Sequence, residues 1–132
     1  MGRFVMDASA VIAVLREEPG AEQVIPHLCG SLISTVNLAE VFCKSQSRGI
    51  LPATDTLTIQ QMKLEVVPFD AEQAQLLANI LPKTLGSSVG FADRACMALA
   101  MQQQMPALTG DRDWLNHDAG VEIQLFRNRE AA

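Results

Sequence analysis

Short apolar runs alternate along the chain with longer stretches in which apolar residues recur at helical spacing. Runs such as RFVM and PALT are too short for helices and predict buried strands. In the segment ASAVIAVLREE the apolar residues recur along one side of a helix, and Gly20 lies beyond it as a stop. The pattern predicts strands over residues 3–6, 31–35, 65–69, 106–109 and 121–126, and helices over residues 8–18, 20–30, 36–49, 52–64, 71–81, 91–104 and 112–117.

The order of these elements predicts the fold class. Strands that alternate with helices are typical of an α/β layer fold with a largely parallel sheet. No repeat or linker divides the sequence, so we expect a single domain over residues 1–132. Pro26 interrupts the second helical stretch and indicates a helix start or a kink, and the Gly/Ser-rich residues 82–90 indicate a flexible loop.

Composition narrows the class of protein further. Hydrophobic residues make up 48% of the chain and charged residues 19%, a balance typical of globular rather than disordered proteins. No apolar stretch approaches the roughly 20 residues of a membrane span. The N-terminal segment MGRFVMDASA does not resemble a secretory signal. We therefore expect a cytoplasmic protein with no membrane attachment.

The thiol and imidazole side chains do not form a recognisable metal motif. Cys29, Cys43 and Cys96 are odd in number, far apart and set in helix-like segments, so we expect reduced, buried thiols. His27 and His117 are too few and too isolated for a zinc site. Any metal bound by this chain would therefore have to be held by oxygen ligands.

Four acidic residues are predicted to arrive at one edge of the sheet. Asp7 directly follows the first strand, and Asp111 follows the strand over residues 106–109. Asp93 lies in the first turns of helix 91–104, and Glu40 lies in the second turn of helix 36–49. Helices that follow parallel strands begin at the carboxyl edge of the sheet, where ligands bind in such folds. We therefore expect the four carboxylates to meet there.

Each of these acids also has an ordinary structural explanation. Asp7 and Asp111 could be helix N-caps, a role worth about 1 kcal/mol. Asp93 near a helix N-terminus gains about 0.3–1 kcal/mol from the helix dipole. Glu40 could pair with Lys44 four residues later, for about 0.3 kcal/mol. Taken one by one, the acids do not decide between structure and chemistry.

Their joint placement favours a metal site. Asp93 and Glu40 lie within apolar runs, where an acid is costly unless it is paired or bound to metal. Neighbouring carboxylates repel one another, and a divalent cation removes that repulsion. Ligation by oxygen alone indicates Mg²⁺ or Mn²⁺. The formal net charge of −5 weakens a nucleic-acid function without excluding it, because such cations offset the acids where a phosphate would bind.

Four segments resemble the PIN-domain family, and most closely the VapC-type toxins of bacterial toxin–antitoxin pairs: VMDASAVIAVL, STVNLAEVF, FADRACMALA and PALTGDRDW. The likeness covers essentially the whole chain, with the motifs in the family's order and spacing. It implies a three-layer α/β/α fold around a central, mainly parallel sheet. It also implies a Mg²⁺- or Mn²⁺-dependent endoribonuclease acting on RNA, a cognate antitoxin that covers the acidic groove, and a homodimer.

The resemblance also assigns roles to individual residues. Ser9 and Thr109 match the hydroxyl positions that accompany the first and last acids, although both could serve only as caps. Ala92 stands where related toxins often carry Gly or another small residue, a mild departure. The four acidic positions of the family, catalytic and metal-binding, fall on Asp7, Glu40, Asp93 and Asp111.

For several residues near the four acids, the sequence allows two interpretations. Asp113 is either a further metal ligand or an acid that only favours the dipole of its short helix. Arg94 and Arg112 flank the acids and either hold RNA phosphates or form a solvated surface. Asp118, in the segment HDAG, is predicted to be a turn residue.

Other functions on the same fold class require residues that this chain lacks. A phosphoacceptor receiver domain needs paired acids after the first strand and a Lys after the last, where this chain has Ala8-Ser9 and Arg127. A phosphatase with an aspartyl nucleophile needs a second Asp at position 9. The remaining alternative to a nuclease is a PIN-like module that binds RNA or protein without cutting. In the nuclease hypothesis, Asp7, Asp93 and Asp111 hold the cation, and Glu40 completes the shell or orients the attacking water.

Overall fold

The computed structural model describes residues 2–127, and a five-stranded sheet lies at its centre. The strands are β1 (Val5–Met6), β2 (Leu32–Ser34), β3 (Glu65–Val67), β4 (Ala107–Thr109) and β5 (Ile123–Leu125), in the spatial order β3-β2-β1-β4-β5. Every neighbouring pair is parallel. The chain builds β1, β2 and β3 in one direction and then returns to add β4 and β5 on the other side of β1. The strand order therefore reverses between β1 and β4, the kind of position at which open α/β sheets bind ligands.

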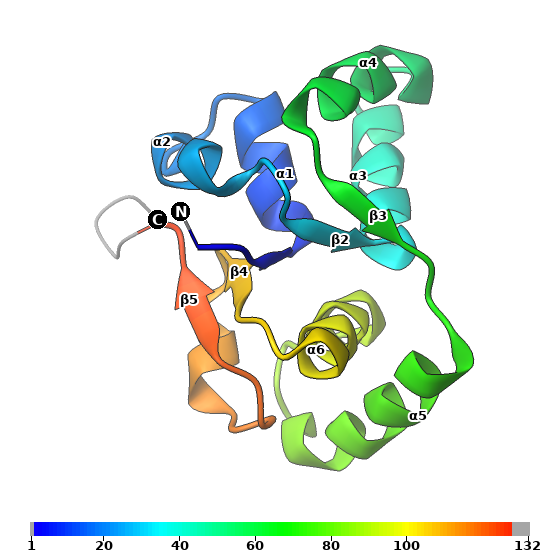
Figure 1. The fold of residues 1–132 in the computed structure, drawn as a ribbon, viewed down its shortest axis with the longest axis vertical. Coiled ribbons are helices and arrows are strands. Elements are labelled where there is room, and N and C mark those ends of the chain that lie inside the picture. The colour runs from blue at the N-terminus through cyan, green and yellow to red at the C-terminus, as the bar shows by residue number, and fades with distance from the viewer. Residues whose placement is uncertain (1, 128–132) are drawn as a thin grey trace.

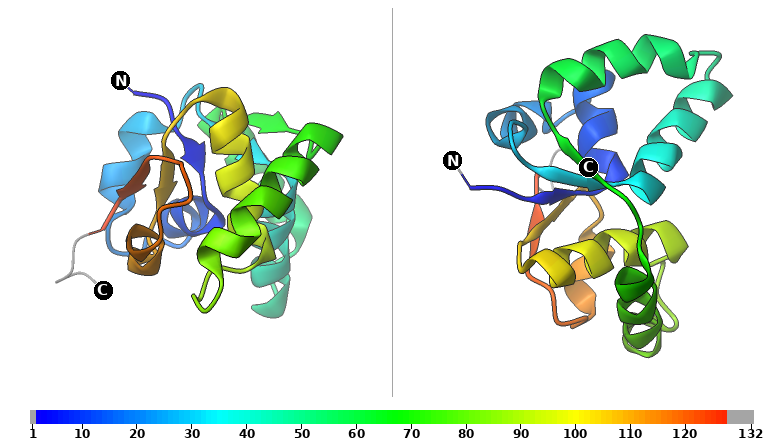
Figure 2. Two further views of the ribbon diagram at one scale, coloured as in Figure 1. Left: turned by 90° about the horizontal axis from the view of Figure 1, so that it is seen from below. Right: turned by 45° about the vertical axis from the view of Figure 1, so that its right-hand side comes forward.

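Helices cover both faces of this sheet (Figures 1 and 2). One layer holds α1 (Ala8–Leu15), α2 (Ala21–Val24), α3 (Thr35–Ser47) and α4 (Pro52–Met62). The opposite layer holds α5 (Ala71–Ile80) and α6 (Phe91–Gln103). Within residues 2–127, three short 3-10 helices complete the connections: η1 (Ile25–His27), η2 (Leu81–Thr84) and η3 (Arg112–Asn116). The predicted three-layer α/β/α fold with a parallel sheet is confirmed.

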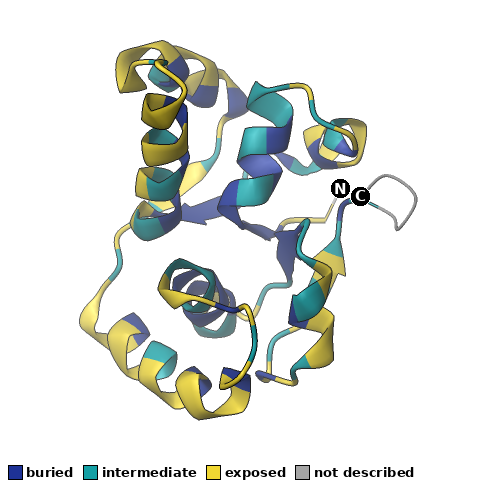
Figure 3. Cartoon of the chain, turned by 180° about the vertical axis from the view of Figure 1, so that it is seen from behind, coloured by how far each residue is buried: buried dark blue, intermediate teal, exposed yellow. Residues whose placement is uncertain are grey.

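Two hydrophobic cores result from the alternation of side chains along the strands. Met6 and Ile33 face the α1–α4 layer, whereas their neighbours Val5 and Leu32 pack toward α6. Because both faces are covered, the central strands are buried throughout, which explains their unbroken apolar sequences. Figure 3 shows the same division, with buried strands at the centre and exposed outer surfaces on α4 and α5.

The structure refines the predicted elements at three places. Pro26 occupies the start of η1, so the second helical stretch ends at Val24 and continues as a 3-10 turn. The segment over residues 82–90 is partly ordered, because η2 reaches Thr84 and buries its side chain. The short helix after β4 is a 3-10 helix rather than an α-helix. Asp118 is a turn residue as predicted, since its Oδ1 accepts from the backbone N–H of Gly120 at 3.1 Å.

The prediction for the cysteines is wrong in one respect. All three thiols are free, but only Cys96 is buried, whereas Cys29 and Cys43 are exposed. Cys43 lies between the buried residues Val41 and Ser45 of α3 and therefore faces outward on that helix. Cys29 lies in the turn between η1 and β2 rather than in a helix. None of the helices within residues 2–127 is long and apolar enough to cross a membrane.

Candidate active site

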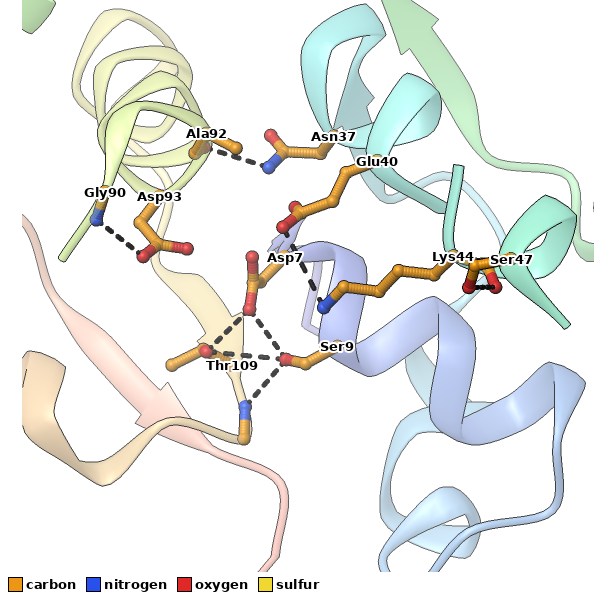
Figure 4. A network of polar contacts seen from close by, with 11 residues as sticks. Asp7, Ser9, Asn37, Glu40, Lys44, Ser47, Gly90, Ala92, Asp93 and Thr109 are labelled. Carbon is orange, nitrogen blue, oxygen red and sulfur yellow. Dashed lines mark hydrogen bonds and ion pairs between the residues drawn. The ribbon is translucent and has the colours of Figure 1, made fainter. Parts of the chain in front are cut away.

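All four predicted acids line one hollow at the carboxyl edge of the sheet. This acidic hollow has a volume of about 510 Å³. Four different elements supply the acids: the end of β1, α3, α6 and the turn after β4. Figure 4 shows the carboxyl groups of Asp7, Glu40 and Asp93 turned toward the same space. The residues lining the acidic hollow are Asp7, Ser9, Glu40, Lys44, Asp93, Gly110, Asp111 and Arg127.

Asp7 lies at the bottom of the site and is only 5% exposed. Its Oδ2 accepts hydrogen bonds from Ser9 Oγ at 2.6 Å and from Thr109 Oγ1 at 2.8 Å. Burial raises the pKa of Asp7 above 3.8, and the two hydroxyl donors oppose that effect. Asp7 occupies the N-cap position of α1, but its side chain makes no capping hydrogen bond. Helix capping therefore does not explain why a carboxylate is buried here.

The same hydroxyl groups connect the ends of β1 and β4. The backbone N–H of Gly110 donates to Ser9 Oγ at 3.0 Å, and that of Asp111 donates to Thr109 Oγ1 at 3.1 Å. Each hydroxyl thus accepts from the turn after β4 while it donates to Asp7. Ser9 and Thr109 therefore position Asp7 relative to the turn that carries Asp111.

Glu40 reaches the acidic hollow from α3. Its Oε2 lies 3.9 Å from Lys44 Nζ, so the ion pair expected at this spacing is present. Its Oε1 is buried and has no hydrogen-bond partner among the described residues. Burial raises the pKa of Glu40, as does the charge of Asp7, and Lys44 opposes both. The ion pair therefore accounts for only one oxygen of this carboxylate.

Asp93 combines a capping contact with a strongly perturbed carboxyl group. Its Oδ2 accepts from the backbone N–H of Gly90 at 2.9 Å, at the start of α6. Burial raises the pKa of Asp93 to about 6, the Gly90 N–H opposes this, and the charges of Asp7, Glu40 and Asp111 add to it. A pKa near neutrality in a cluster of acids is typical of functional sites.

Asp111 and Asp113 differ in what they face. Asp111 caps η3 by accepting from the backbone N–H of Asp113 at 3.0 Å, and it also lines the acidic hollow. Asp113 does not line this hollow. Its carboxylate accepts from the backbone N–H of Ser88 at 3.0 Å, from Ser88 Oγ at 2.8 Å and from Asn116 Nδ2 at 3.0 Å. These donors, the Ser88 N–H foremost, hold the pKa of Asp113 far below its usual range.

The two arginines considered as phosphate contacts lie elsewhere. Arg94 Nε donates to Thr84 Oγ1 at 2.9 Å, so this side chain holds η2 against α6. Arg112 is exposed and lines a separate hollow with Phe4 and His27. Within the described part of the chain, the basic residues at the acidic hollow are instead Lys44 and Arg127. Arg127 follows β5 after one residue, Phe126, so the strand-end reasoning that found the acids places its backbone at the same edge of the sheet but not the direction of its side chain.

The chemistry of the site fits a hard divalent cation. In each of the four acids one carboxylate oxygen is held by a neighbour: Ser9 and Thr109, Lys44, the Gly90 N–H and the Asp113 N–H. The other oxygen of each accepts no hydrogen bond from residues 2–127 and remains available as a donor to metal. In their present rotamers no three Asp, Glu, His or Cys side chains in the described chain are arranged to hold an ion. Binding would therefore require these side chains to draw closer together.

The comparison with known protein families identifies the chain. The family model of the PIN domain matches residues 4–120. The chain belongs to the PIN domain family. No curated protein sequence matches this PIN domain.

Solved structures agree with this PIN fold over nearly the whole chain. A toxin–antitoxin complex from Klebsiella pneumoniae aligns with a TM-score of 0.76 at 11% identity, covering 95% of this chain and 98% of that one. DNA-bound VapBC from Salmonella typhimurium aligns with a TM-score of 0.72 at 17% identity, covering 96% and 99%. FitAcB from Neisseria gonorrhoeae aligns with a TM-score of 0.68 at 22% identity, covering 91% and 95%. At these identities the likeness establishes the fold of the PIN domain.

Proposed function

We propose that this PIN domain is a divalent-metal-dependent endoribonuclease and the toxin of a toxin–antitoxin pair. One observation carries the proposal: four acids from four different elements line the same hollow, namely Asp7, Glu40, Asp93 and Asp111. The proposal treats residues 1–132 as a single domain working in the cytoplasm on RNA.

Asp7, Asp93 and Asp111 would hold Mg²⁺ or Mn²⁺, and Glu40 would complete the shell or orient the attacking water. A bound divalent cation lowers the pKa of water and offsets negative charge on a phosphate. Asp113 is outside this proposed set because its carboxylate is already held by Ser88 and Asn116.

The remaining residues of the acidic hollow position the carboxylates. Ser9 and Thr109 fix Oδ2 of Asp7, which directs its other oxygen toward Glu40 and Asp93 (Figure 4). Lys44 holds Oε2 of Glu40 and leaves Oε1 free. The pKa of Asp93 is about 6, and a cation or another positive charge that enters the hollow would lower this pKa and favour loss of the proton.

An antitoxin is proposed as the natural inhibitor. Several structurally similar proteins were solved as complexes with such partners, including those from Klebsiella pneumoniae and Salmonella typhimurium. A cluster of carboxylates with free oxygens is suited to receive an Arg or Lys side chain from a partner. A homodimer is also part of the proposal, and the molecular mass of the purified chain in solution tests it.

The experiment for the nuclease compares cleavage of mixed RNA by the antitoxin-free chain in Mg²⁺, in Mn²⁺ and in EDTA. Asp93→Asn removes one carboxylate while keeping an oxygen that can accept from Gly90. Asp118→Asn is the matched control, because Asp118 is an exposed turn residue away from the site. We expect cleavage that requires both the cation and Asp93 and is unaffected in Asp118→Asn.

Two results would refute the nuclease proposal. One is cleavage that survives in EDTA or in a folded Asp93→Asn chain. The other is tight RNA binding without cleavage by folded, metal-loaded protein, which would favour the alternative of a binding module.

A further inference from the structure

A second hollow adjoins the acidic one and carries the opposite charge. Of the ten basic residues of this acidic chain, four line it, and Glu18 is the single acid that lines it among residues 2–127. It has a volume of about 410 Å³, within the range of ligand pockets, which is about 300–1,000 Å³. It shares Ser9, Lys44 and Arg127 with the acidic hollow, so the two hollows adjoin. The four basic residues of this basic hollow are Arg16, Lys44, Arg48 and Arg127.

One face of α3 links the two hollows. Glu40, Lys44 and Arg48 follow one another at intervals of four residues and therefore lie on the same side of the helix. Glu40 faces the acidic hollow, Lys44 lines both hollows, and Arg48 lines only the basic one. The charge along this face thus changes from negative to positive with distance from the four acids.

The positive charges are not all neutralised within the protein. The charge of Arg16 is largely neutralised by an ion pair, because its Nη2 lies 3.1 Å from Oδ2 of Asp55. Arg48 is exposed and forms no ion pair within residues 2–127. Arg127 is half-buried and forms no ion pair within residues 2–127. Its guanidinium lies over the ring of Phe126, at 4.6 Å from the ring centroid, and its buried Nε has no hydrogen-bond partner among the described residues. Among the described residues that line the basic hollow, Arg48 and Arg127 are therefore the two cations available to a ligand.

Helix electrostatics explain only part of this arrangement. Lys44 and Arg48 near the C-terminal end of α3 are favoured by the helix dipole whether or not they bind anything. Arg127 belongs to neither α1 nor α3, because it follows β5, and it nevertheless faces the same hollow. Convergence of cations from separate elements onto a hollow that adjoins an acidic site is expected for binding an anionic chain.

We propose that the basic hollow binds a backbone phosphate of the RNA next to the phosphate cleaved in the acidic hollow, through Arg48 and Arg127. The inference rests on the proposed nuclease function and adds how the substrate is held. Contacts to phosphates position the nucleic acid without reading its sequence, so this subsite acts on any RNA that the enzyme accepts. Lys44 bridges the two hollows, but its ion pair with Glu40 makes it a poor probe of phosphate binding alone.

The test measures binding separately from cleavage. Antitoxin-free chain carrying Asp93→Asn is titrated against a short, fluorescently labelled single-stranded RNA of mixed sequence, and anisotropy is followed between about 50 and 200 mM salt. Arg48→Gln and Arg127→Gln are each compared with the parent chain. Arg48→Lys, which keeps the charge at position 48, is the control for Arg48→Gln. Lys63→Gln is the matched control, because Lys63 is an exposed cation at the C-cap of α4, before β3 and away from both hollows.

We expect each Gln variant to weaken binding by about three- to tenfold and to reduce the salt slope by about 0.7, the value for one lost phosphate contact on single strands. Arg48→Lys and Lys63→Gln should keep the slope of the parent chain. In the cleavage-competent chain, Arg48→Gln should raise KM with little change in kcat, because the contact is made before and during the reaction.

The outcomes distinguish failure of the proposed phosphate subsite from failure of the proposed nuclease function. An unchanged slope in Arg48→Gln and Arg127→Gln, or no RNA binding by the parent chain, overturns the subsite even if the metal-loaded enzyme cuts RNA. A slope that falls in both variants, while Lys63→Gln retains it, supports the subsite even if no cleavage is found. An RNA-binding chain that does not cut would thus refute the nuclease and leave the subsite standing.

Discussion

Thr109 Oγ1 donates a hydrogen bond of 2.8 Å to Oδ2 of Asp7, joining two residues that lie 102 positions apart in the sequence. The contact crosses from β4 to β1, where the order of strands reverses. It fixes one oxygen of the buried carboxylate and leaves the other facing the remaining acids. The geometry of the candidate site thus depends on the parallel pairing of these two strands.

Removal of this hydroxyl should weaken metal binding without unfolding the protein. Thr109→Val keeps the shape of the side chain and removes the donor, so Asp7 is less well oriented and its pKa rises further. Loss of a contact that orients a ligand typically costs about 10- to 100-fold in metal affinity. Calorimetric titration with Mn²⁺ measures the change, and Thr58→Val on the exposed surface of α4 is the control. Equal Mn²⁺ affinity for Thr109→Val and the parent chain would show that the hydroxyl does not position Asp7.

The raised pKa of Asp93 predicts how stability depends on pH in the metal-free protein. Its value is about 6 in the fold, against an ordinary value of 3.8, so the fold prefers the protonated acid. The contribution of protonated Asp93 to the stability of the fold is fully present below pH 3.8 and is lost as the pH rises through about 6. Asp93→Asn should therefore gain stability relative to the parent chain as the pH increases, as measured by urea unfolding at a series of pH values. Parallel pH profiles for the two chains would contradict the assignment.

Gly110 makes room for Arg127 at the boundary between the two hollows. A Cβ at this position would lie 2.8 Å from Cζ of Arg127. Because a flexible side chain can move away, Gly110→Ala should fold with nearly unchanged stability but displace the guanidinium. RNA binding should fall about as far as in Arg127→Gln, and the double variant should be no weaker than either single one. Additive losses of RNA affinity in the double variant would show that Gly110→Ala weakens binding in some way other than by displacing Arg127.

The ion pair between Arg16 and Asp55 joins α1 to α4 and should be important for stability. The side chain of Arg16 is 17% exposed and that of Asp55 is 4% exposed. Arg16→Met would leave the Asp55 carboxylate buried without its partner, at a cost of about 3 kcal/mol. The double variant Arg16→Met/Asp55→Leu should recover much of this loss, as measured by urea unfolding. A double variant less stable than Arg16→Met would show that the pair itself, rather than the unpaired charge, determines the effect.

Local sequence patterns were sufficient for most of the fold. Val5 and Met6 point to different cores because successive strand residues alternate in direction, and that alternation is a property of the backbone alone. The ends of β1 and β4, together with the starts of α3 and α6, identified four acids that line one hollow. Strand ends and helix starts are local features, and a parallel sheet brings them to a common edge.

Side-chain direction on irregular segments could not be predicted in the same way. Asp113 lies close to Asp111 in sequence, yet it turns to Ser88, and Arg94 beside Asp93 turns to Thr84. Both partners come from the segment between α5 and α6, whose path depends on packing rather than on its own sequence. Cys43 was misjudged for a related reason, since an apolar neighbourhood in sequence does not reveal which side of a helix is covered.

The sequence by itself determined the alternation of strands and helices, the parallel sheet, and the positions at which acids leave its strands. Only the tertiary structure decided that Arg127, after the last strand, lies over Gly110 and faces both hollows beside Lys44 and Arg48. The physical reason is that periodicity and capping act between residues a few positions apart. The charge of a hollow, by contrast, is the sum of side chains that the order of strands brings together from distant parts of the chain.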